Sequence, residues 1–288
     1  MITAMSYVFT AQQLCLQALA KTIWERRGLA KRIGLPYGEE TVTETFLLDL
    51  ATTYPGAVTI VPFTKWLEGK SGSDWAWSFV SADGSYSYPM MMQAKVLDDA
   101  DQEYNEIKRT IGKTTMRQID RLLDVARKLG FPAYYAFYNH ITNVARVPDN
   151  CNSLQLLGVP MPESWGVSIA AAEHVLSGLP DQSFDRHRAH SMPLHCLLCS
   201  FGTGTVGPFG TPGIVARRLR LDERAGHFPV ESPDRLPPGV QRGTNRLFDL
   251  AYEAAGIVDP DHRGSLIARL KEIYPGIDGV VIVRDRKN

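Results

Sequence analysis

Four polar side chains in the first third of the chain have the types and spacing that could act on a phosphate ester. Asp74 opens an apolar run after Gly72, and Gln93 and Lys95 stand two apart at the end of the next apolar run. Neighbouring side chains of a strand point to opposite faces, so Gln93 and Lys95 would share one face. Glu44, in the preceding segment, offers a second carboxylate. We therefore predict one polar site from these residues.

The chemistry that fits this set is hydrolysis of a phosphodiester with the help of a divalent cation. Mg²⁺ prefers hard oxygen ligands, and when bound it polarises a phosphate and acidifies a water molecule. Asp74, the side-chain oxygen of Gln93 and the backbone carbonyl of Ala94 are suitable ligands. Glu44 would add an auxiliary ligand, and Lys95 would orient the water or stabilise charge on phosphorus. We expect Mg²⁺ as cofactor, with Mn²⁺ as a substitute.

The predicted elements bring these residues together. The Asp83-Gly84 turn predicts a hairpin between the second and third of three strands, which sets Asp74 opposite the segment that holds Gln93 and Lys95. Apolar periodicity predicts helices over 11–32, 40–53 and 115–129, and strands over 57–63, 74–80, 88–97 and 132–138. From residue 40 the order is αβββαβ, which indicates an α/β fold with a mixed central sheet flanked by helices.

These residues in this order resemble the PD-(D/E)XK nuclease core over roughly residues 38 to 140. The resemblance rests on Glu44 in a helix, Gly72-Ser73-Asp74 entering a strand and Gln93-Ala94-Lys95 closing the next. The glutamine variant is similar to the Mrr-like branch of restriction and defence nucleases, and the GSDWAW stretch resembles an uncharacterised bacterial family with a G-x-D-W core. The resemblance implies a restriction-endonuclease-like fold and metal-dependent cleavage of DNA, RNA being less favoured, in bacterial anti-phage defence.

Gln93 departs from the family's usual acidic residue, and this departure leaves two questions open. A neutral amide binds Mg²⁺ more weakly than a carboxylate does, so the number of metal ions is not determined. The alternative function is a catalytically weak or inactive module of the same fold that binds nucleic acid or senses an effector.

The chain divides into a nuclease core with an N-terminal helix over 1–145 and a C-terminal α/β elaboration of unknown role over 146–288. In the second part, 165–179 predicts a loop that leads into a helix. Short helices are expected over 243–255 and 263–273, and a last strand over 279–283.

Two further groups of side chains have both a functional and a structural interpretation. Arg117 and Gln118, on the helix 115–129, either contact the nucleic acid or lie on a helix surface. The second group could offer nitrogen and sulfur ligands to zinc and consists of His187, His190, His195, Cys196 and Cys199. It includes no second cysteine pair and lies in an apolar run, so we do not favour structural zinc.

The bulk composition indicates an ordinary globular protein. The 288 residues are 44% hydrophobic, and 31 basic side chains balance 31 acidic ones, so a nucleic acid would be held by a local patch rather than by net charge. Four cysteines are too few for a disulfide scaffold, and neither a signal peptide nor an apolar span is evident. We expect a cytoplasmic protein with nucleic acid and not a membrane as its partner, and a homo-oligomer stays open.

Overall fold

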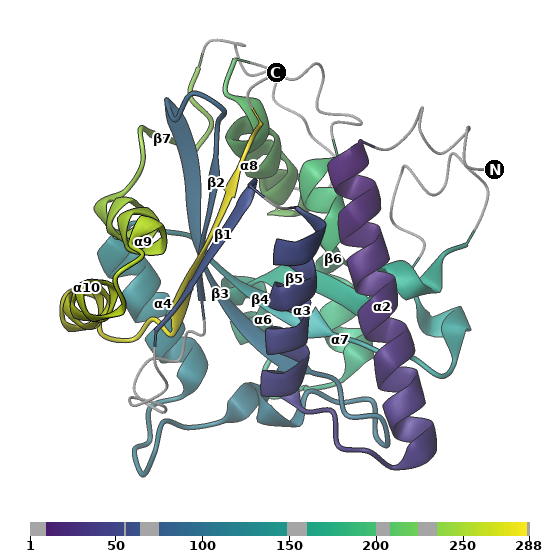
Figure 1. Ribbon diagram of the computed structural model, residues 1–288. Coiled ribbons are helices and arrows are strands. Elements are labelled where there is room, and N and C mark those ends of the chain that lie inside the picture. The colour runs from purple at the N-terminus through teal and green to yellow at the C-terminus, as the bar shows by residue number, and fades with distance from the viewer. Residues whose placement is uncertain are drawn as a thin grey trace.

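The computed structural model describes residues 10–54, 56–63, 75–148, 160–199, 208–223 and 235–286. In these ranges eight strands form a single mixed sheet with helices on both faces (Figure 1). This confirms the expected α/β class and the mixed sheet flanked by helices. The expected order αβββαβ is also present, as α3 (Glu39–Thr53), β1 (Val58–Pro62), β2 (Trp75–Val80), β3 (Tyr86–Val96), α4 (Gln118–Leu129) and β4 (Ala133–Tyr138).

The sheet takes strands from both sides of residue 145. Its order is β1-β8-β2-β3-β4-β5-β6, and β7 pairs with β3 beside this path. The last strand of the chain, β8, lies between β1 and β2 (Figure 1), antiparallel to β1 and parallel to β2. The C-terminal part of the chain therefore completes the central sheet, with β5 (Val167–Ala171), β6 (Ser191–Pro193), β7 (Gln241–Arg242) and β8 (Gly279–Arg284).

The strands β2 and β3 form the hairpin that the Asp83-Gly84 turn predicts. Gly84 has a φ of 78°, a left-handed conformation that favours glycine. Asp83 accepts hydrogen bonds from the side chain and backbone of Ser85, which lower the pKa of Asp83 to about 2. At the other end of the hairpin, Trp75 pairs with Met92. This register puts Gln93 and the residues after it beyond the described end of β2.

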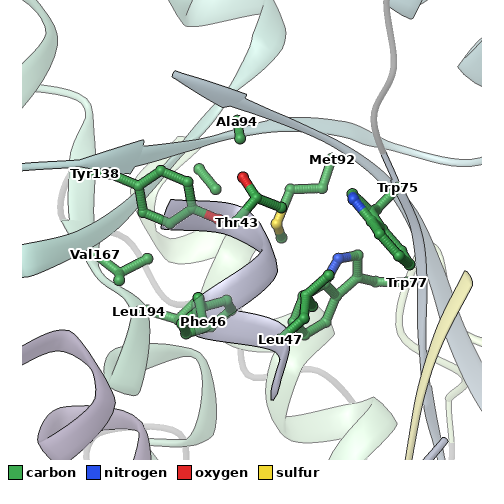
Figure 2. Close-up of a pocket in the computed structure, with 11 residues that line it drawn as sticks. Thr43, Phe46, Leu47, Trp75, Trp77, Met92, Ala94, Tyr138, Val167 and Leu194 are labelled. Atoms are coloured by element: carbon green, nitrogen blue, oxygen red, sulfur yellow. The ribbon is translucent and has the colours of Figure 1, made fainter. Parts of the chain in front are cut away.

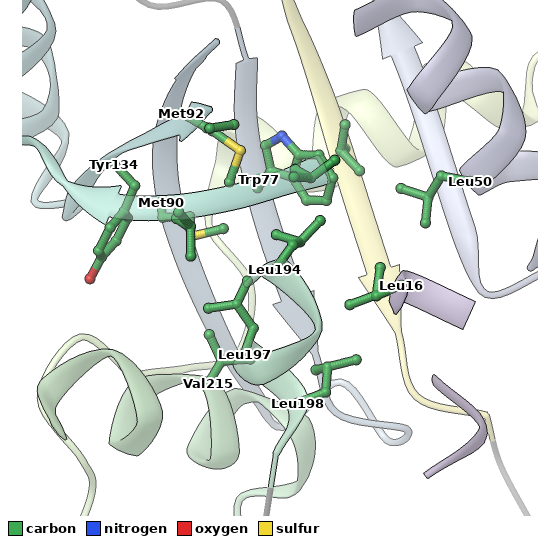
Figure 3. Close-up of a cluster of buried hydrophobic side chains, with 14 of the residues drawn as sticks. Leu16, Leu50, Trp77, Met90, Met92, Tyr134, Leu194, Leu197, Leu198 and Val215 are labelled. Atoms are coloured by element: carbon green, nitrogen blue, oxygen red, sulfur yellow. The ribbon is translucent and has the colours of Figure 1, made fainter. Parts of the chain in front are cut away.

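Two apolar layers enclose the sheet. Side chains of α2 (Ala11–Ile33), α3, η4 (Leu194–Leu198) and α8 (Gly210–Glu223) form a core with one face, and Figure 3 shows part of this core around Trp77. The opposite face packs against α4, α6 (Ala172–Gly178), α9 (Arg246–Gly256) and α10 (Pro260–Ile273). The remaining short elements are η1 (Asn105–Lys108), η2 (Val144–Arg146), η3 (Pro162–Gly166) and α7 (Phe184–Arg188).

The helix α2 has clear sequence signals at both ends and a close contact in its middle. The hydroxyl of Thr10 accepts from the Gln13 backbone at 3.2 Å, and the Gln13 side chain accepts from the Thr10 backbone at 2.9 Å, which forms a capping box. Gly34 ends the helix with a φ of 68°. A Cβ on Gly166 would lie 1.9 Å from the carbonyl oxygen of Ala20, so α2 and η3 approach each other backbone to backbone.

One segment differs from the sequence prediction. Residues 165–179 were expected to be a loop leading into a helix, but the strand β5 precedes α6 there. β5 pairs antiparallel with β4 on one side and β6 on the other, and most of it is buried. A short apolar run without alternation does not distinguish a buried strand from other buried segments, so periodicity missed it.

Candidate active site

Gln93 and Lys95 lie near the end of β3 on the face that also carries Met91 and Leu97. They share this face, as the alternation predicts. Their exposed fractions are 1% and 2%, so this strand end is not a solvated surface. Burial of an ammonium and an amide is unfavourable unless polar partners replace water. The partners come from two helices that cover different faces of the sheet.

The ammonium of Lys95 is paired with Glu39, the first residue of α3. Lys95 Nζ lies 3.2 Å from each carboxylate oxygen of Glu39. The Glu39 side chain is 28% exposed, so the ion pair reaches from the core to the surface. The positive end of the helix dipole also stabilises a carboxylate in the first turn of α3.

Glu44, the carboxylate selected from the sequence, occupies an exposed position on the same helix. It follows Glu39 by five residues, which corresponds to about 140° around the helix axis. The two side chains therefore point to different sides of α3. The sequence analysis did not select Glu39, because the packing of α3 on the sheet determines which of its carboxylates contacts Lys95. The signal that points to Glu39 is its place in the acidic first turn of α3.

Gln93 contacts the helix on the other face of the sheet. Its Nε2 donates to Oε1 of Gln118, the first residue of α4, at 3.3 Å. Its Oε1 is buried and has no hydrogen-bond partner in the described part of the chain. A buried oxygen without a donor is destabilising. Because this oxygen is a hard ligand, it is suited to a cation such as Mg²⁺.

The structure also locates the other predicted nucleic-acid contact, Arg117. Its guanidinium donates to both carboxylate oxygens of Asp120 at 2.7 and 2.8 Å. These hydrogen bonds raise the pKa of Arg117 and lower that of Asp120. The Arg117 side chain is 39% exposed and directly precedes Gln118, so it lies at the surface beside the candidate site.

The residues present offer hard oxygen ligands. Asp74 lies outside the described residues, directly before Trp75 in the sequence. Elsewhere in the described ranges, no group of three or more His, Cys, Asp or Glu side chains is arranged to hold a metal ion. Of the predicted ligands that the structure describes at this strand end, the amide oxygen of Gln93 and the backbone carbonyl of Ala94 fit Mg²⁺ chemically.

The histidine and cysteine side chains considered for zinc lie in a different part of the fold. Cys196 and His195 are buried in η4, with 3.7 Å between Cys196 Sγ and His195 Nε2. The ring of His187 contacts the backbone oxygen of Asp181 at 3.0 Å through Nε2. Burial lowers the pKa of His187, which favours its neutral form.

The reverse face of β3, opposite Gln93 and Lys95, is apolar. Trp75 and Trp77 line a small cavity there of about 20 Å³, together with Met92 (Figure 2). A space of this size holds about one water molecule. The two indoles therefore pack between the sheet and α3, behind the candidate site.

Comparisons with known proteins identify a family without an assigned activity. A family profile described as "Family of unknown function (DUF6615)" matches residues 12–287, which include the whole candidate site. No curated protein and no solved structure matches the chain. Within the described ranges, every helix is too short or too polar to cross a membrane.

Proposed function

Because the chain belongs to this family, DUF6615, whose function is unknown, its activity must be inferred from its own residues, and we propose a metal-dependent nuclease that hydrolyses phosphodiester bonds in DNA. The observation that supports the proposal is the ion pair of the buried Lys95 with Glu39, two residues along the strand from the buried amide oxygen of Gln93. A buried ammonium such as that of Lys95 is seldom the most stable choice at a strand end, since an apolar residue of similar volume is often as good or better. A catalytic role explains why polar groups occupy this strand end.

Three of the four proposed metal ligands lie at or next to the hairpin in the sequence, and the fourth, Glu44, lies in α3. Gln93 Oε1, the backbone carbonyl of Ala94 and the carboxylate of Asp74 would hold Mg²⁺ or Mn²⁺, and Glu44 would be at most an auxiliary ligand. When bound, the ion polarises the phosphate and lowers the pKa of a water molecule. Gln118 fixes the orientation of the Gln93 amide, because its side-chain oxygen accepts a hydrogen bond from Gln93 Nε2.

Lys95 supplies the positive charge of the proposed site. The two carboxylate oxygens of Glu39 orient this ammonium, and we propose Glu39 as a positioning residue. A fixed ammonium stabilises charge that develops on the phosphate in the transition state without having to reorganise. Arg117, the 39% exposed residue directly before α4, is the proposed contact to a phosphate of the bound strand.

The substrate class and setting follow the resemblance to PD-(D/E)XK nucleases. We propose DNA in preference to RNA, cleavage in the cytoplasm and a role in anti-phage defence. The protein acts on its own or as a homo-oligomer. The rival is a module of the same fold that binds nucleic acid or senses an effector without cleaving.

Plasmid nicking with Mg²⁺ or Mn²⁺ tests the proposal. The parent protein is compared with Asp74→Asn, Lys95→Met and the surface control Lys128→Gln, whose ammonium pairs with Asp124 on the exposed side of α4. We expect the first two variants to lose about 100-fold or more in rate and the control to keep it. Equal cleavage by all four proteins would discard the assignment, and DNA binding without cleavage by the parent would favour the rival.

A further inference from the structure

Two histidines meet where β5 ends and β6 begins. The two strands are antiparallel with Ala170 opposite Ser191, so the chain that leaves β5 lies beside the chain that enters β6. His174 lies in α6, which directly follows β5, and His190 directly precedes β6. The centroids of the two imidazole rings are 4.9 Å apart, and the ring planes are inclined by 42°. The strand pairing thus brings together two imidazoles from different elements.

Both rings are accessible from the solvent. His190 is exposed and His174 is half-buried. In the ranges that the structure describes, no hydrogen bond engages a ring nitrogen of either residue, whereas Nε2 of the nearby His187 contacts the backbone oxygen of Asp181 at 3.0 Å. His190 belonged to the group of side chains considered for zinc from the sequence, but its partner in the fold, His174, did not. The ring nitrogens of this pair are therefore available to an external ligand.

The spacing of the two rings fits two imidazoles on one metal ion. A zinc–nitrogen bond is about 2.0 to 2.1 Å long and the ring centroid lies about 1.2 Å behind the nitrogen, so a bound ion lies about 3.2 Å from each centroid. Two centroids that are 4.9 Å apart then subtend about 100° at the ion, between the octahedral and the tetrahedral ligand angles. The last side-chain torsion of histidine has a broad range, which allows the nitrogens to turn toward a common point.

The charges around the pair favour ions that coordinate nitrogen over ions that are attracted by charge alone. Arg186 is a cation close to His190, and Arg188 is paired with Asp185 at 2.9 Å. Burial, and then the charges of His174 and Arg186, lower the pKa of His190, so its ring is neutral at neutral pH, which is the form that binds metals. A nearby arginine opposes Mg²⁺, which also prefers oxygen ligands, whereas Zn²⁺, Cu²⁺ and Ni²⁺ form strong bonds with imidazole.

We propose that His174 and His190 together bind one transition-metal ion of the Zn²⁺ and Cu²⁺ class through their ring nitrogens. Two protein ligands are fewer than the four of a structural zinc site, so water completes the coordination and the ion exchanges with the solvent. The ion links α6 to the chain that enters β6. The proposal does not depend on nuclease activity, because it uses none of the residues of the proposed nuclease site.

Calorimetric titration of the full chain, without an affinity tag, with Zn²⁺ tests the proposal. Excess Mg²⁺ is present throughout, so that the proposed nuclease site holds its own ion. The parent is compared with His174→Gln, His190→Gln and the control His262→Gln, which changes an exposed histidine of α10. Each ring is held next to the other, so loss of either should weaken Zn²⁺ binding by about 10-fold or more, while the control should keep the parent affinity. Equal Zn²⁺ affinity of the parent and either pair variant would overturn the proposal.

Electron paramagnetic resonance of bound Cu²⁺ identifies the ligands directly. We expect nitrogen couplings from two imidazoles in the parent and in His262→Gln, and from a single imidazole in His174→Gln and His190→Gln. Circular dichroism of the same samples shows whether each variant is folded, and the parent spectrum is informative even if a variant is not. A parent spectrum with couplings from fewer than two imidazoles, or with couplings that His174→Gln leaves unchanged, would overturn the proposal.

Discussion

Lys95 and Glu39 are 56 residues apart in the chain, yet Lys95 Nζ lies 3.2 Å from each carboxylate oxygen of Glu39. The lysine comes from the strand β3 and the glutamate from the first turn of the helix α3. Because the contact uses both oxygens, it holds the ammonium in one orientation while the glutamate stays at the surface. Removal of the carboxylate would leave a buried charge without this partner, which is strongly unfavourable.

Glu39→Gln should therefore slow cleavage and destabilise the fold. We expect a loss of about 10- to 100-fold in the nicking rate, typical of removing a group that orients a site residue, and a smaller loss for Glu44→Gln. Glu40→Gln, an exposed neighbour in the same turn, is the matched control and should cleave at the parent rate. To separate positioning from folding, the rates are compared at a temperature where urea titration shows each variant to be fully folded. A larger loss in Glu44→Gln than in Glu39→Gln would contradict the assignment.

The buried oxygen of Gln93 predicts how the protein responds to metal. Gln93→Glu replaces a neutral ligand by a charged one, so Mn²⁺ should raise the melting temperature more in this variant than in the parent. In EDTA the same variant should melt below the parent, because a carboxylate is buried without its cation. Gln93→Leu removes the ligand and should lose the response. Melting curves in Mn²⁺ and in EDTA give the comparison, and an identical metal response in all three proteins would refute it.

The close approach of η3 to α2 predicts that Gly166 tolerates no side chain. The Cβ of Gly166→Ala would lie 1.9 Å from the backbone oxygen of Ala20, which no side-chain movement can relieve. We expect a loss of about 1 to 3 kcal/mol in the free energy of unfolding, or more if the helix is displaced. Gly264→Ala, in the helix α10 with no atom within 4 Å of the new Cβ, should be neutral or stabilising by up to about 1 kcal/mol. Urea unfolding of the parent and the two variants measures the contrast. Equal free energies of unfolding for Gly166→Ala and Gly264→Ala would contradict the close backbone contact between η3 and α2.

A second buried charge joins α2 to the segment that follows β3. The side chain of Arg27 is 3% exposed, and its Nη2 donates to the backbone oxygen of Leu97 and to Asp99 Oδ2, the latter at 3.2 Å. Burial acts to raise the pKa of Asp99, but His140, whose Nδ1 lies 3.7 Å from Asp99 Oδ1, and the charges of Arg27 and Lys31 outweigh it and lower the pKa overall.

This lowered pKa gives a pH dependence with a definite sign. A carboxyl group whose pKa is lower in the folded state stabilises the fold above its unfolded pKa, about 3.9 for Asp, and loses this contribution as the pH falls through the folded value. Asp99→Asn should therefore lower the free energy of unfolding by about 1 to 3 kcal/mol at neutral pH. The difference from the parent should shrink below about pH 4. Urea titrations from neutral to acidic pH test this, with Asp124→Asn, an exposed partner of Lys128, as the control expected to change stability by less than about 1 kcal/mol. A difference that is constant with pH would contradict it.

The sequence alone determined the local features on which the candidate site depends. Apolar periodicity predicted α2, α3, α4, α9 and α10 and five of the eight strands, but it missed α7 and α8, and the Asp83-Gly84 turn predicted the hairpin of β2 with β3. The alternation of a strand was enough to put Gln93 and Lys95 on one face. These features depend on residues close in the chain, so their signals are present in short stretches of sequence.

Only the tertiary structure decided which distant groups meet. The rotation of α3 on the sheet makes Glu39, and not Glu44, the partner of Lys95, and the docking of α4 brings Gln118 to Gln93. The same holds for β8, whose place between β1 and β2 depends on pairing with strands more than 190 residues earlier in the chain. Such contacts depend on how whole apolar faces pack together, and a helix presents several carboxylates of which packing selects one.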